Sequence, residues 1–478
     1  MRIFGHRATV WWGGMLALWW VLAAFSPSAQ ARDLTLAQCI ELAWANDPDA
    51  RHYKEKAEIG KLKRSKAVQD FYPKLDYYLT QGPQVDYFGR PVTGQNLFYT
   101  GVGLEQPLYK GGTLTRGLRL AETDTRKQEK DYQARRLAVA AEAISAFYQV
   151  LSGQALVKNY EALLRQGEED LREAQARQAA GTGTRLEVLE LSVKVLEVQQ
   201  KLSKAKAQQQ VQQAALRKVT GVEEQTPLML HREFPLQDIR GDLHSLLNEA
   251  QSRRPDLASG REEIAYQQLK TDIEKGKRWP QLSLVARYEW EDPQLFQGRK
   301  DWLVFLKASI SLGNSTVSYD EQRNQIYPNV FAFPPPPGQR AQTFAFSTRT
   351  LKYSIFDRSS NKVEVEEARA TRDLAQRRWQ QLRRQVDQDV KEAHALKEDS
   401  ANRLETARKQ IIMARELVEI NRTKYAAGLA TLSEVFKART ALTEAEVSLA
   451  TARNDQAAAL GKLYQALGRE LHLQGGGG

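Results

Sequence analysis

An internal repeat constrains this chain of 478 residues more than any other feature of its sequence. Residues 36–75 match residues 243–282 at a constant offset of 207 positions. Further along, residues 179–188 match residues 426–435 at an offset of 247. The second copy therefore carries about 40 extra residues, which fall between positions 283 and 355. Two matched blocks in the same order predict two copies of one structural unit that pack against each other.

Each copy reads as a helix, two β segments and a long helical hairpin. The hairpins, expected at 113–220 and 361–467, are rich in good helix-forming residues. Small and apolar residues recur in them at alternating spacings of four and three, as in a coiled coil. The seam of the second copy comprises Ala438, Leu442, Ala445, Leu449, Ala452, Gln456, Ala459, Leu463 and Ala466, and that of the first comprises Leu191, Val195, Val198, Leu202, Ala205, Gln209, Gln212, Leu216 and Val219. Such a seam predicts close helix packing.

The β segments, at 73–109 in the first copy and 280–356 in the second, have a period of two. In the first segment Leu75, Tyr77 and Leu79 alternate with Asp76, Tyr78 and Thr80. One apolar face and one small or polar face are typical of outer-membrane barrel strands, although a soluble hairpin can show the same pattern. Because four strands cannot close a barrel alone, we expect the chain to oligomerise.

Two segments of the second copy compete for the role of fourth strand. Residues 301–312 resemble a strand, and so do residues 343–356. We favour 343–356, because it leads into the following helix at the matching offset. The insertion at 291–342 contains four consecutive prolines, Pro334 to Pro337, and is expected to form an extended loop at the outer face, since proline cannot donate a hydrogen bond within a sheet. Either an idle loop or a contact for a phage or another partner fits it.

The first 31 residues read as a cleaved signal peptide. Arg2 and Arg7 precede an apolar run from Val10 to Phe25, and Ala29-Gln30-Ala31 supplies the small residues of a cleavage site. An uncleaved membrane anchor is the alternative, but the run is short for a span of roughly 20 residues. The sequence therefore predicts export from the cytoplasm.

Composition argues against several classes of function. A single cysteine, Cys39, excludes a disulfide scaffold and a multi-cysteine metal site. The six histidines are too widely spaced for a helical metal pair, and no nucleotide-binding or nucleophile-elbow motif is present. The formal charge of +11 permits a nucleic-acid-binding coiled coil, but the charges are mixed along the helices and the export signal opposes that interpretation. We expect no enzyme activity, cofactor, metal or nucleic-acid partner.

Together these features resemble the TolC-like outer-membrane efflux protein family over about residues 33–470. The motifs are Leu34-Thr35-Leu36 leading to Pro48, the run Gln106-Pro107-Leu108-Tyr109-Lys110-Gly111-Gly112, and the paired segments 179–188 and 426–435. The resemblance implies a mainly α protein with a transmembrane β-barrel part. In this architecture a homotrimer forms a 12-strand β-barrel that continues into a 12-helix periplasmic α-barrel.

The resemblance also implies a function and partners. Such proteins are passive exit ducts, in contact with outer-membrane lipid, for small molecules or proteins. They work with a periplasmic adaptor (membrane fusion) protein and an inner-membrane transporter. A soluble periplasmic coiled-coil adaptor is the alternative, but adaptors usually have one hairpin instead of two matched ones. The cargo and the transporter class do not follow from the sequence, because the wall of such a tunnel is generic.

The domain boundaries follow from the repeat and the resemblance together. The first efflux-protein repeat spans residues 32–221 and the second spans 242–468. An equatorial linker at 222–241 joins them, and a C-terminal tail occupies 469–478.

In this family the gate lies at the periplasmic tips of the hairpins, where a tyrosine bonds to an acid of the other hairpin and acidic rings line the constriction. By resemblance, Tyr425 is that tyrosine and Glu187 is its partner. Glu434 matches a ring acid, while Lys437 stands at the second ring position and Glu190 is its counterpart in the first copy. The four ring positions carry three acids and one lysine, a net charge of −2 per chain, which predicts a weaker cation preference than a purely acidic ring would give. Plain exposed helix charges are the alternative interpretation.

The turns of the two hairpins complete the candidate site. They contain Gly181 and Thr184 in the first copy and Gly428 and Thr431 in the second. By resemblance, these turns are where the adaptor docks.

Overall fold

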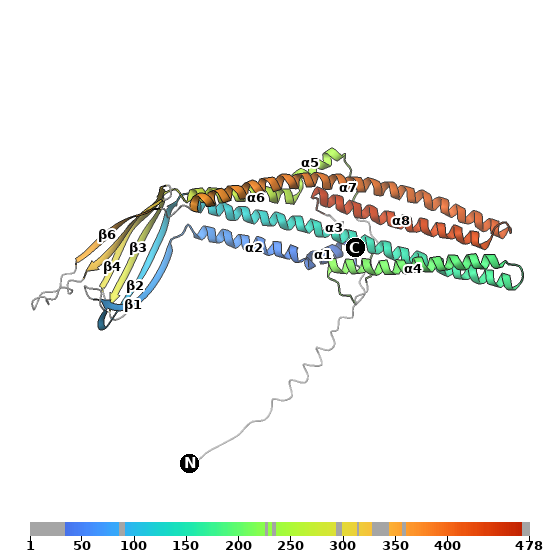
Figure 1. Ribbon diagram of the computed structural model, residues 1–478, viewed down its shortest axis with the longest axis horizontal. Coiled ribbons are helices and arrows are strands. Elements are labelled where there is room, and N and C mark those ends of the chain that lie inside the picture. The colour runs from blue at the N-terminus through green and yellow to red at the C-terminus, as the bar shows by residue number, and fades with distance from the viewer. Residues whose placement is uncertain are drawn as a thin grey trace, which may run out of the picture.

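The computed structural model describes residues 34–85, 91–224, 228–231, 236–292, 299–312, 315–326, 344–355 and 360–470. They form an elongated molecule with a β-sheet at one end and two helical hairpins that point to the other (Figure 1). The architecture is mainly α-helical with a small antiparallel sheet, which confirms the expected fold class at this level. The signal peptide expected at 1–31 and the proline run at 334–337 lie outside the described residues.

The helices of the two copies correspond closely. The first copy contains α1 (Leu36–Asn46), α2 (Pro48–Gln69), α3 (Thr113–Ala179) and α4 (Arg185–Thr220). The second contains α5 (Leu243–Arg253), α6 (Pro255–Gly276), α7 (Ser360–Ala426) and α8 (Leu432–Leu467). The bounds of α5 and α6 lie 207 positions after those of α1 and α2, and those of α7 and α8 lie 247 positions after those of α3 and α4. The repeat in the sequence is therefore a repeat in the structure.

The long helices α3 and α7 set the length of the molecule. Each has 67 residues, or about 100 Å of helix at 1.5 Å per residue. The shorter helices α2 and α4 both pack along α3, at opposite ends of it. Where they meet, α1 and residues 228–231 cover α3, and Leu36, Phe147 and Leu228 are buried in one apolar cluster. This equatorial core fixes α2 and α4 on the same long helix.

In both copies an ion pair connects the N-terminus of the second short helix, α2 or α6, to the long helix, but the acid and the base are exchanged. Asp47 caps α2 by accepting from the Ala50 amide at 2.7 Å, and its carboxylate also receives Arg135 of α3 at 2.6 Å. This ion pair holds the pKa of Asp47 below its usual range. In the second copy the equivalent position is Arg254, which donates to Asp389 of α7 at 2.9 Å. An ion pair to the long helix is thus retained while acid and base change places.

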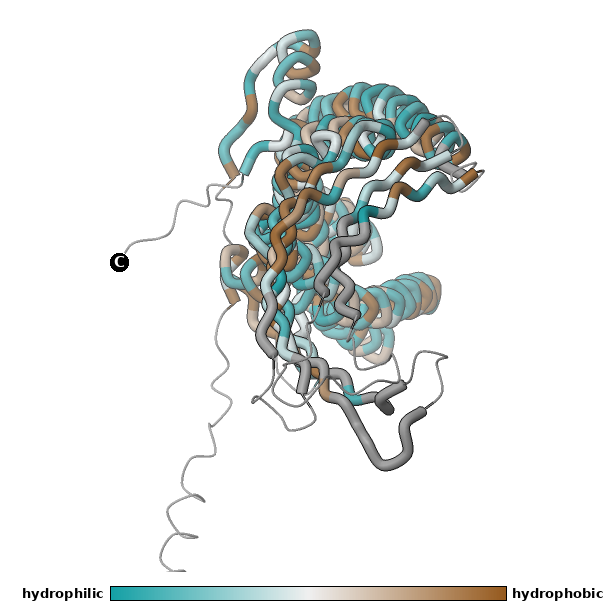
Figure 2. The backbone as a smooth tube through the Cα atoms, turned by 90° about the vertical axis from the view of Figure 1, so that its left-hand side faces the viewer, coloured by the Kyte–Doolittle hydropathy of each residue, from teal (hydrophilic) through white to brown (hydrophobic). Residues whose placement is uncertain are grey.

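The elements of one chain form an open array with two free edges. Towards the hairpin tips the lateral order of the helices is α4, α3, α8, α7. Between the equator and the sheet the order is α2, α3, α6, α7. Seen along its length, the array is curved and open (Figure 2). Within the described residues, no helix combines the length and apolar character needed to cross a membrane.

The sheet corrects the expected number of strands. The strands are β1 (Lys74–Val85), β2 (Pro91–Lys110), β3 (Gln281–Asp292), β4 (Arg299–Leu312), β5 (Ser315–Ile326) and β6 (Phe344–Ser354). They pair antiparallel in chain order as one six-stranded sheet. The four strands expected per chain are therefore too few, and residues 291–342 are not simply a loop. The two segments that competed for the fourth strand both form strands, β4 and β6. β5 lies between them in the chain, so the number of strands stays even.

The register of the sheet aligns apolar residues into rows across the strands. Leu75 pairs with Leu104, Leu104 with Ala286, and Ala286 with Val304. On the other face, Asp76 pairs with Gly103 and Gly103 with Arg287. In Figure 2, apolar and polar residues alternate along the strands at this end of the molecule. Side chains of neighbouring residues in a strand point to opposite faces, so one face of the sheet is apolar and exposed.

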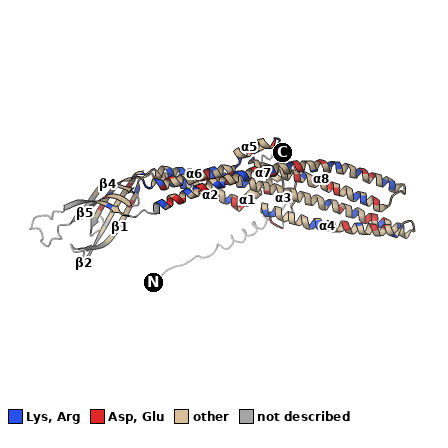
Figure 3. Ribbon diagram, turned by 45° about the horizontal axis from the view of Figure 1, so that its top comes forward, with Lys and Arg blue, Asp and Glu red and all other residues tan. Residues whose placement is uncertain are grey.

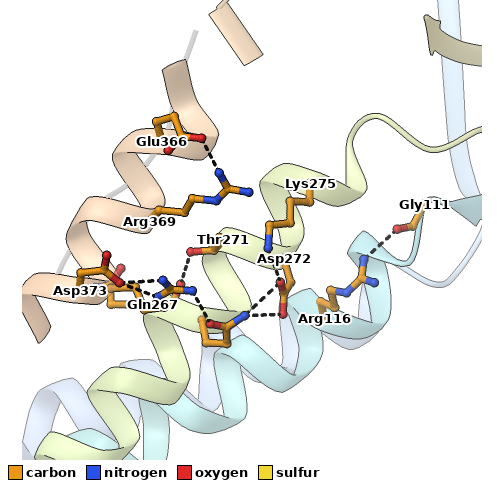
Figure 4. A network of polar contacts seen from close by, with 11 residues as sticks. Gly111, Arg116, Gln267, Thr271, Asp272, Lys275, Glu366, Arg369 and Asp373 are labelled. Carbon is orange, nitrogen blue, oxygen red and sulfur yellow. Dashed lines mark hydrogen bonds and ion pairs between the residues drawn. The ribbon is translucent and has the colours of Figure 1, made fainter. Parts of the chain in front are cut away.

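The junction between sheet and helices depends on a close approach of two backbones. Gly111, directly after β2, has a φ of +60°, and a Cβ placed there would lie 2.1 Å from the carbonyl oxygen of Gly276. The Gly111 carbonyl accepts a hydrogen bond from Arg116 at 2.9 Å. Figure 4 shows this contact beside the charged pairs of α6 and α7, among them Lys275 with Asp272. Only glycine satisfies both the backbone conformation and the space at this turn.

Candidate functional site: the hairpin tips

The two hairpins end in turns of the same construction. Gly181 and Gly428 have φ values of +74° and +72°, a conformation that glycine adopts without strain. After each turn a threonine caps the next helix. Thr184 accepts from the Glu187 amide and Thr431 accepts from the Glu434 amide, both at 3.2 Å. These caps fix where α4 and α8 begin, and hence the height of the acids one turn into each helix.

The two matched acids use their carboxylates differently. Glu434 accepts from the Thr431 amide at 2.9 Å, which completes a capping box within its own hairpin. Glu187 instead accepts from the Leu432 amide at 2.9 Å. Leu432 is the first residue of α8, so an acid of the first hairpin caps the helix of the second. Residues that are equivalent by the repeat therefore bind the two tips together in an asymmetric way.

Tyr425 bonds to a different acid from the one expected. Its hydroxyl donates to Glu173 of α3 at 2.8 Å, whereas the sequence analysis expected Glu187. Arg177 lies 5.0 Å above the tyrosine ring and forms an ion pair with Glu173 at 3.1 Å. Burial and the bond to Glu173 raise the pKa of Tyr425 to about 12, so the hydroxyl stays protonated at neutral pH. The carboxylate of Glu187 caps α8 instead of accepting from Tyr425.

The remaining ring residues are exposed. Glu190 and Lys437 are both exposed, and no ion pair joins Lys437 to Glu434 among the residues that the structure describes. A second lysine, Lys194, lies nearby and donates to the Ser433 hydroxyl at 2.6 Å. Burial lowers the pKa of Lys194, and the charge of Lys437 lowers it further. Sequence reasoning missed Lys194, because it lies outside the matched tip segments.

A buried ion pair joins the hairpins one level above the turns. Asp170 of α3 is only 4% exposed, and both of its carboxylate oxygens receive Nη1 of Arg439 on α8, at 2.9 and 2.6 Å. Gln166 adds a third hydrogen bond at 3.1 Å. The repeat gives no hint of this pair, because the equivalent residues are Leu417 and Ser192. Neither partner was predicted.

Apolar packing closes the space between the hairpins. Phe436 of α8 is 1% exposed and packs against Gly167 of α3, where a Cβ would lie 2.7 Å from its ring. Leu191 of α4 and Leu432 of α8 belong to the same buried cluster. The first helical turns of α8 are therefore held against α3 and α4 by packing, by the Asp170 ion pair and by the Glu187 cap.

At the tips, the described residues form an interface between the two hairpins that is partly polar and partly apolar. No group of three or more histidine, cysteine or acidic residues in the described ranges could hold a metal ion. Lysine, arginine and acidic residues are mixed along the helices (Figure 3). The tips can therefore hold two helical hairpins together and present charges at their ends.

Comparison with known proteins identifies the family. The family model described as outer membrane efflux protein matches residues 40–222 and 246–469, once for each copy. The protein belongs to this family. It is an outer-membrane efflux channel, and the soluble adaptor alternative is not favoured. Members of the family function in tripartite efflux systems with an adaptor and an inner-membrane transporter. No curated protein matches the chain in a sequence search.

Solved structures share the whole fold at low sequence identity. CusC has a TM-score of 0.70 at 15% identity, and the match covers 92% of this chain and 93% of CusC. The Campylobacter jejuni outer membrane channel CmeC gives 0.68 at 17%, with 91% and 85% covered. The Neisseria gonorrhoeae outer membrane channel MtrE, solved in its open state, gives 0.68 at 15%, with 91% and 89% covered. The similarity extends over both copies of the efflux channel.

Proposed function

We propose that three copies of this efflux channel form one continuous exit duct that passes through the outer membrane into the periplasm and is closed at its periplasmic end by the hairpin tips. The observation that supports this best is the arrangement of the free edges. At every level of the molecule one edge is formed by α4, α2 or β1, and the other is formed by α7 or β6. Edges that differ from each other and recur on the same two sides favour a closed ring of identical chains.

The free helix edges near the tips carry complementary apolar stripes. On α4 the stripe comprises Leu186, Leu189, Val193 and Leu196, and on α7 it comprises Met413, Leu417 and Ile420. Each of these side chains is at least 45% exposed in the single chain. Both stripes have the three-and-four spacing of a coiled-coil seam. Because α4 begins and α7 ends at a hairpin tip, the stripes of adjacent copies face each other at the same height.

The tip contacts described above supply the closed end of the duct. Within one chain the second hairpin is tied to the first by Tyr425, by Glu187 and by the pair of Asp170 and Arg439. Opening requires the hairpins to separate and these contacts to break. Glu190, Glu434 and Lys437 are then placed to set the charge at the constriction.

The exposed turns at the tips favour a docking role. Gly181, Thr184, Gly428 and Thr431 are all exposed and their backbones are fixed by caps. We assign them to the contact with a periplasmic adaptor, which links the duct to an inner-membrane transporter. A signal peptide at 1–31, cleaved on export, delivers the chain to the outer membrane in this scheme.

The native mass of the protein extracted from outer membranes in detergent tests the assembly. We expect a trimer, and we expect Val193→Glu to reduce it to monomers, because a charge would be placed in the α4–α7 seam. Gln199→Glu is the matched control, since this exposed residue of α4 lies outside the stripe. A monomer found in the soluble periplasmic fraction, or a trimer unaffected by Val193→Glu, would contradict the proposal.

A further inference from the structure

The extra residues of the second copy add a strand pair to the wall of the sheet. β3 pairs with β4 over eleven residues from Gln281 to Glu291, so β3 has no free edge on which β6 could pair. β5 lies between β4 and β6: it pairs with β4 over five residues, from Ala308 to Leu312, and with β6 from Thr316 to Ile326. Among the described residues of the first copy, β1 and β2 are the strands at the corresponding place. The insertion therefore lies within the sheet, and β6 is displaced outwards by two strands.

Along β4, and along β5 as far as Tyr319, the added strands continue the apolar face of the sheet. On β4, Trp302, Val304 and Leu306 are 47–68% exposed and lie in register with the apolar residues of β3. On β5, Tyr319 pairs with Ala308 on one side and with Leu351 on the other. This row extends to Leu282 of β3, so apolar residues continue across four strands. A hairpin that left the wall would have no reason to keep this register with its neighbours.

The opposite face of β5 is polar, and that of β4 carries Lys307 and Ser309 beside the buried Phe305. Ser318 of β5 pairs with Ser309 of β4 and with Lys352 of β6. It lies between Val317 and Tyr319 in the sequence, so the alternation of strand faces places it away from the apolar row. An apolar outer row with a polar inner row is what a strand between lipid and a water-filled lumen requires.

We infer that each chain contributes six strands and that the outer-membrane end of the duct is an 18-stranded barrel. This inference rests on the proposed trimer and concerns the width of its barrel. The edges left free by the sheet are β1 and β6, so β6 of one copy pairs with β1 of the next. Three copies of six give an even number of strands, which a continuous antiparallel barrel needs.

The added strands widen the exit. With strands about 4.8 Å apart and tilted by about 40°, a 12-stranded barrel has a backbone diameter of about 24 Å and an 18-stranded barrel about 36 Å. Barrels of about 16–18 strands leave an aqueous channel, whereas small barrels are filled by their side chains. The barrel of this protein is therefore wide, and the periplasmic tips set the size of the cargo that passes.

Electron cryomicroscopy of the trimer in lipid nanodiscs tests this inference directly. We expect 18 strands in cross-section, with β4 and β5 in the wall. A trimer with twelve strands and the β4–β5 hairpin outside the wall would overturn the inference but leave the proposed duct intact. A particle that is not trimeric would contradict the proposed function itself.

Cysteine labelling in intact outer membranes provides an independent test. The single native cysteine, Cys39, is buried, so the background is low. Val304→Cys and Tyr319→Cys are expected to resist a membrane-impermeant maleimide and to react with a lipid-soluble one. Lys307→Cys and Ser318→Cys, on the other face, are the matched controls and should react with the impermeant reagent. Equal labelling of positions 318 and 319 by the impermeant reagent would overturn the inference.

Discussion

Tyr425, at the end of α7, donates a hydrogen bond of 2.8 Å to Glu173 of α3, and so ties the second hairpin to the first. A hydrogen bond to a charged group contributes about 1.5–3 kcal/mol in favourable settings and less where water competes. Glu173 is about half exposed, so we use about 1 kcal/mol. The contact is one of several that hold the two hairpins together at the tips, which form the closed end of the proposed duct.

Tyr425→Phe is predicted to loosen this closed state. Removal of the hydroxyl alone costs about 1 kcal/mol per chain, which raises the open-to-closed ratio by about fivefold for one chain and by about a hundredfold for three chains that open together. The measurement is the open probability of single trimers in planar bilayers. Tyr53→Phe, a change of the same size in α2 far from the tips, should leave the open probability unchanged. An equal response to both changes would show that Tyr425 does not contribute to closing the channel.

The pH dependence of the channel should also depend on Tyr425. Its pKa of about 12 lies above the ordinary value of 10, so the protonated hydroxyl stabilises the closed state. This contribution is fully present below pH 10 and is lost as the pH rises through about 12. We therefore expect the open probabilities of the native protein and of Tyr425→Phe to differ up to about pH 10 and to converge above it. A difference that stays constant from pH 8 to pH 11.5 would contradict this assignment.

The buried pair of Asp170 and Arg439 is predicted to contribute more than the exposed contacts. Arg439→Gln leaves a buried carboxylate without its partner, which typically costs about 3–5 kcal/mol. We expect faster amide hydrogen exchange in residues 163–174 and 432–442, measured by mass spectrometry. Lys409→Gln, which breaks an exposed pair with Glu405, is the control and should change nothing measurable.

The double change Asp170→Asn with Arg439→Gln separates charge from packing. It removes both charges and leaves two polar groups that can bond to each other, so most of the protection should return. No recovery in the double variant would show that the two side chains act through shape alone.

Much of the fold could be predicted because its signals are local or repeated. The four-and-three seam around Ala438 and Leu442 indicates a helix without reference to the rest of the chain. The repeat then transfers each element from one copy to the other at a fixed offset. Strand β5 has no counterpart in the first copy, and Asp320 to Gln325 lack an apolar alternation. A strand of this kind is recognised only when its neighbours pair with it.

The side-chain partners at the tips were harder to predict for a different reason. Two acids, Glu173 and Glu187, lie near Tyr425, and the choice between them depends on how the two hairpins pack against each other. Glu187 caps α8 through the Leu432 amide, a contact between residues 245 positions apart. The repeat does not predict the pair of Asp170 and Arg439, because the equivalent positions in the other copy hold Leu417 and Ser192.

Packing between the hairpins gives a prediction for Gly167. A Cβ at this position would lie 2.7 Å from the ring of Phe436, so the buried ring, or α3 or α8 with it, must move. Overpacking of this kind typically costs about 1–3 kcal/mol. Gly167→Ala should lower the temperature at which the trimer dissociates in detergent gels, and Gly167→Ala with Phe436→Leu should recover part of the loss. Gly117→Ala is the control, because a Cβ there meets nothing within 4 Å.

The exposed Lys437 is predicted to limit the cation preference of the open channel. Lys437→Glu changes the net charge of the four ring positions from −2 to −4 per chain. A more negative constriction attracts cations and repels anions over roughly a Debye length, about 10 Å at 0.1 M salt. In a potassium chloride gradient we expect the reversal potential to move towards the potassium potential, and to move less in 1 M salt. Lys409→Glu makes the same charge change on α7, away from the ring positions, and should leave the reversal potential where it is. An unchanged reversal potential in Lys437→Glu would show that these residues are ordinary exposed helix charges.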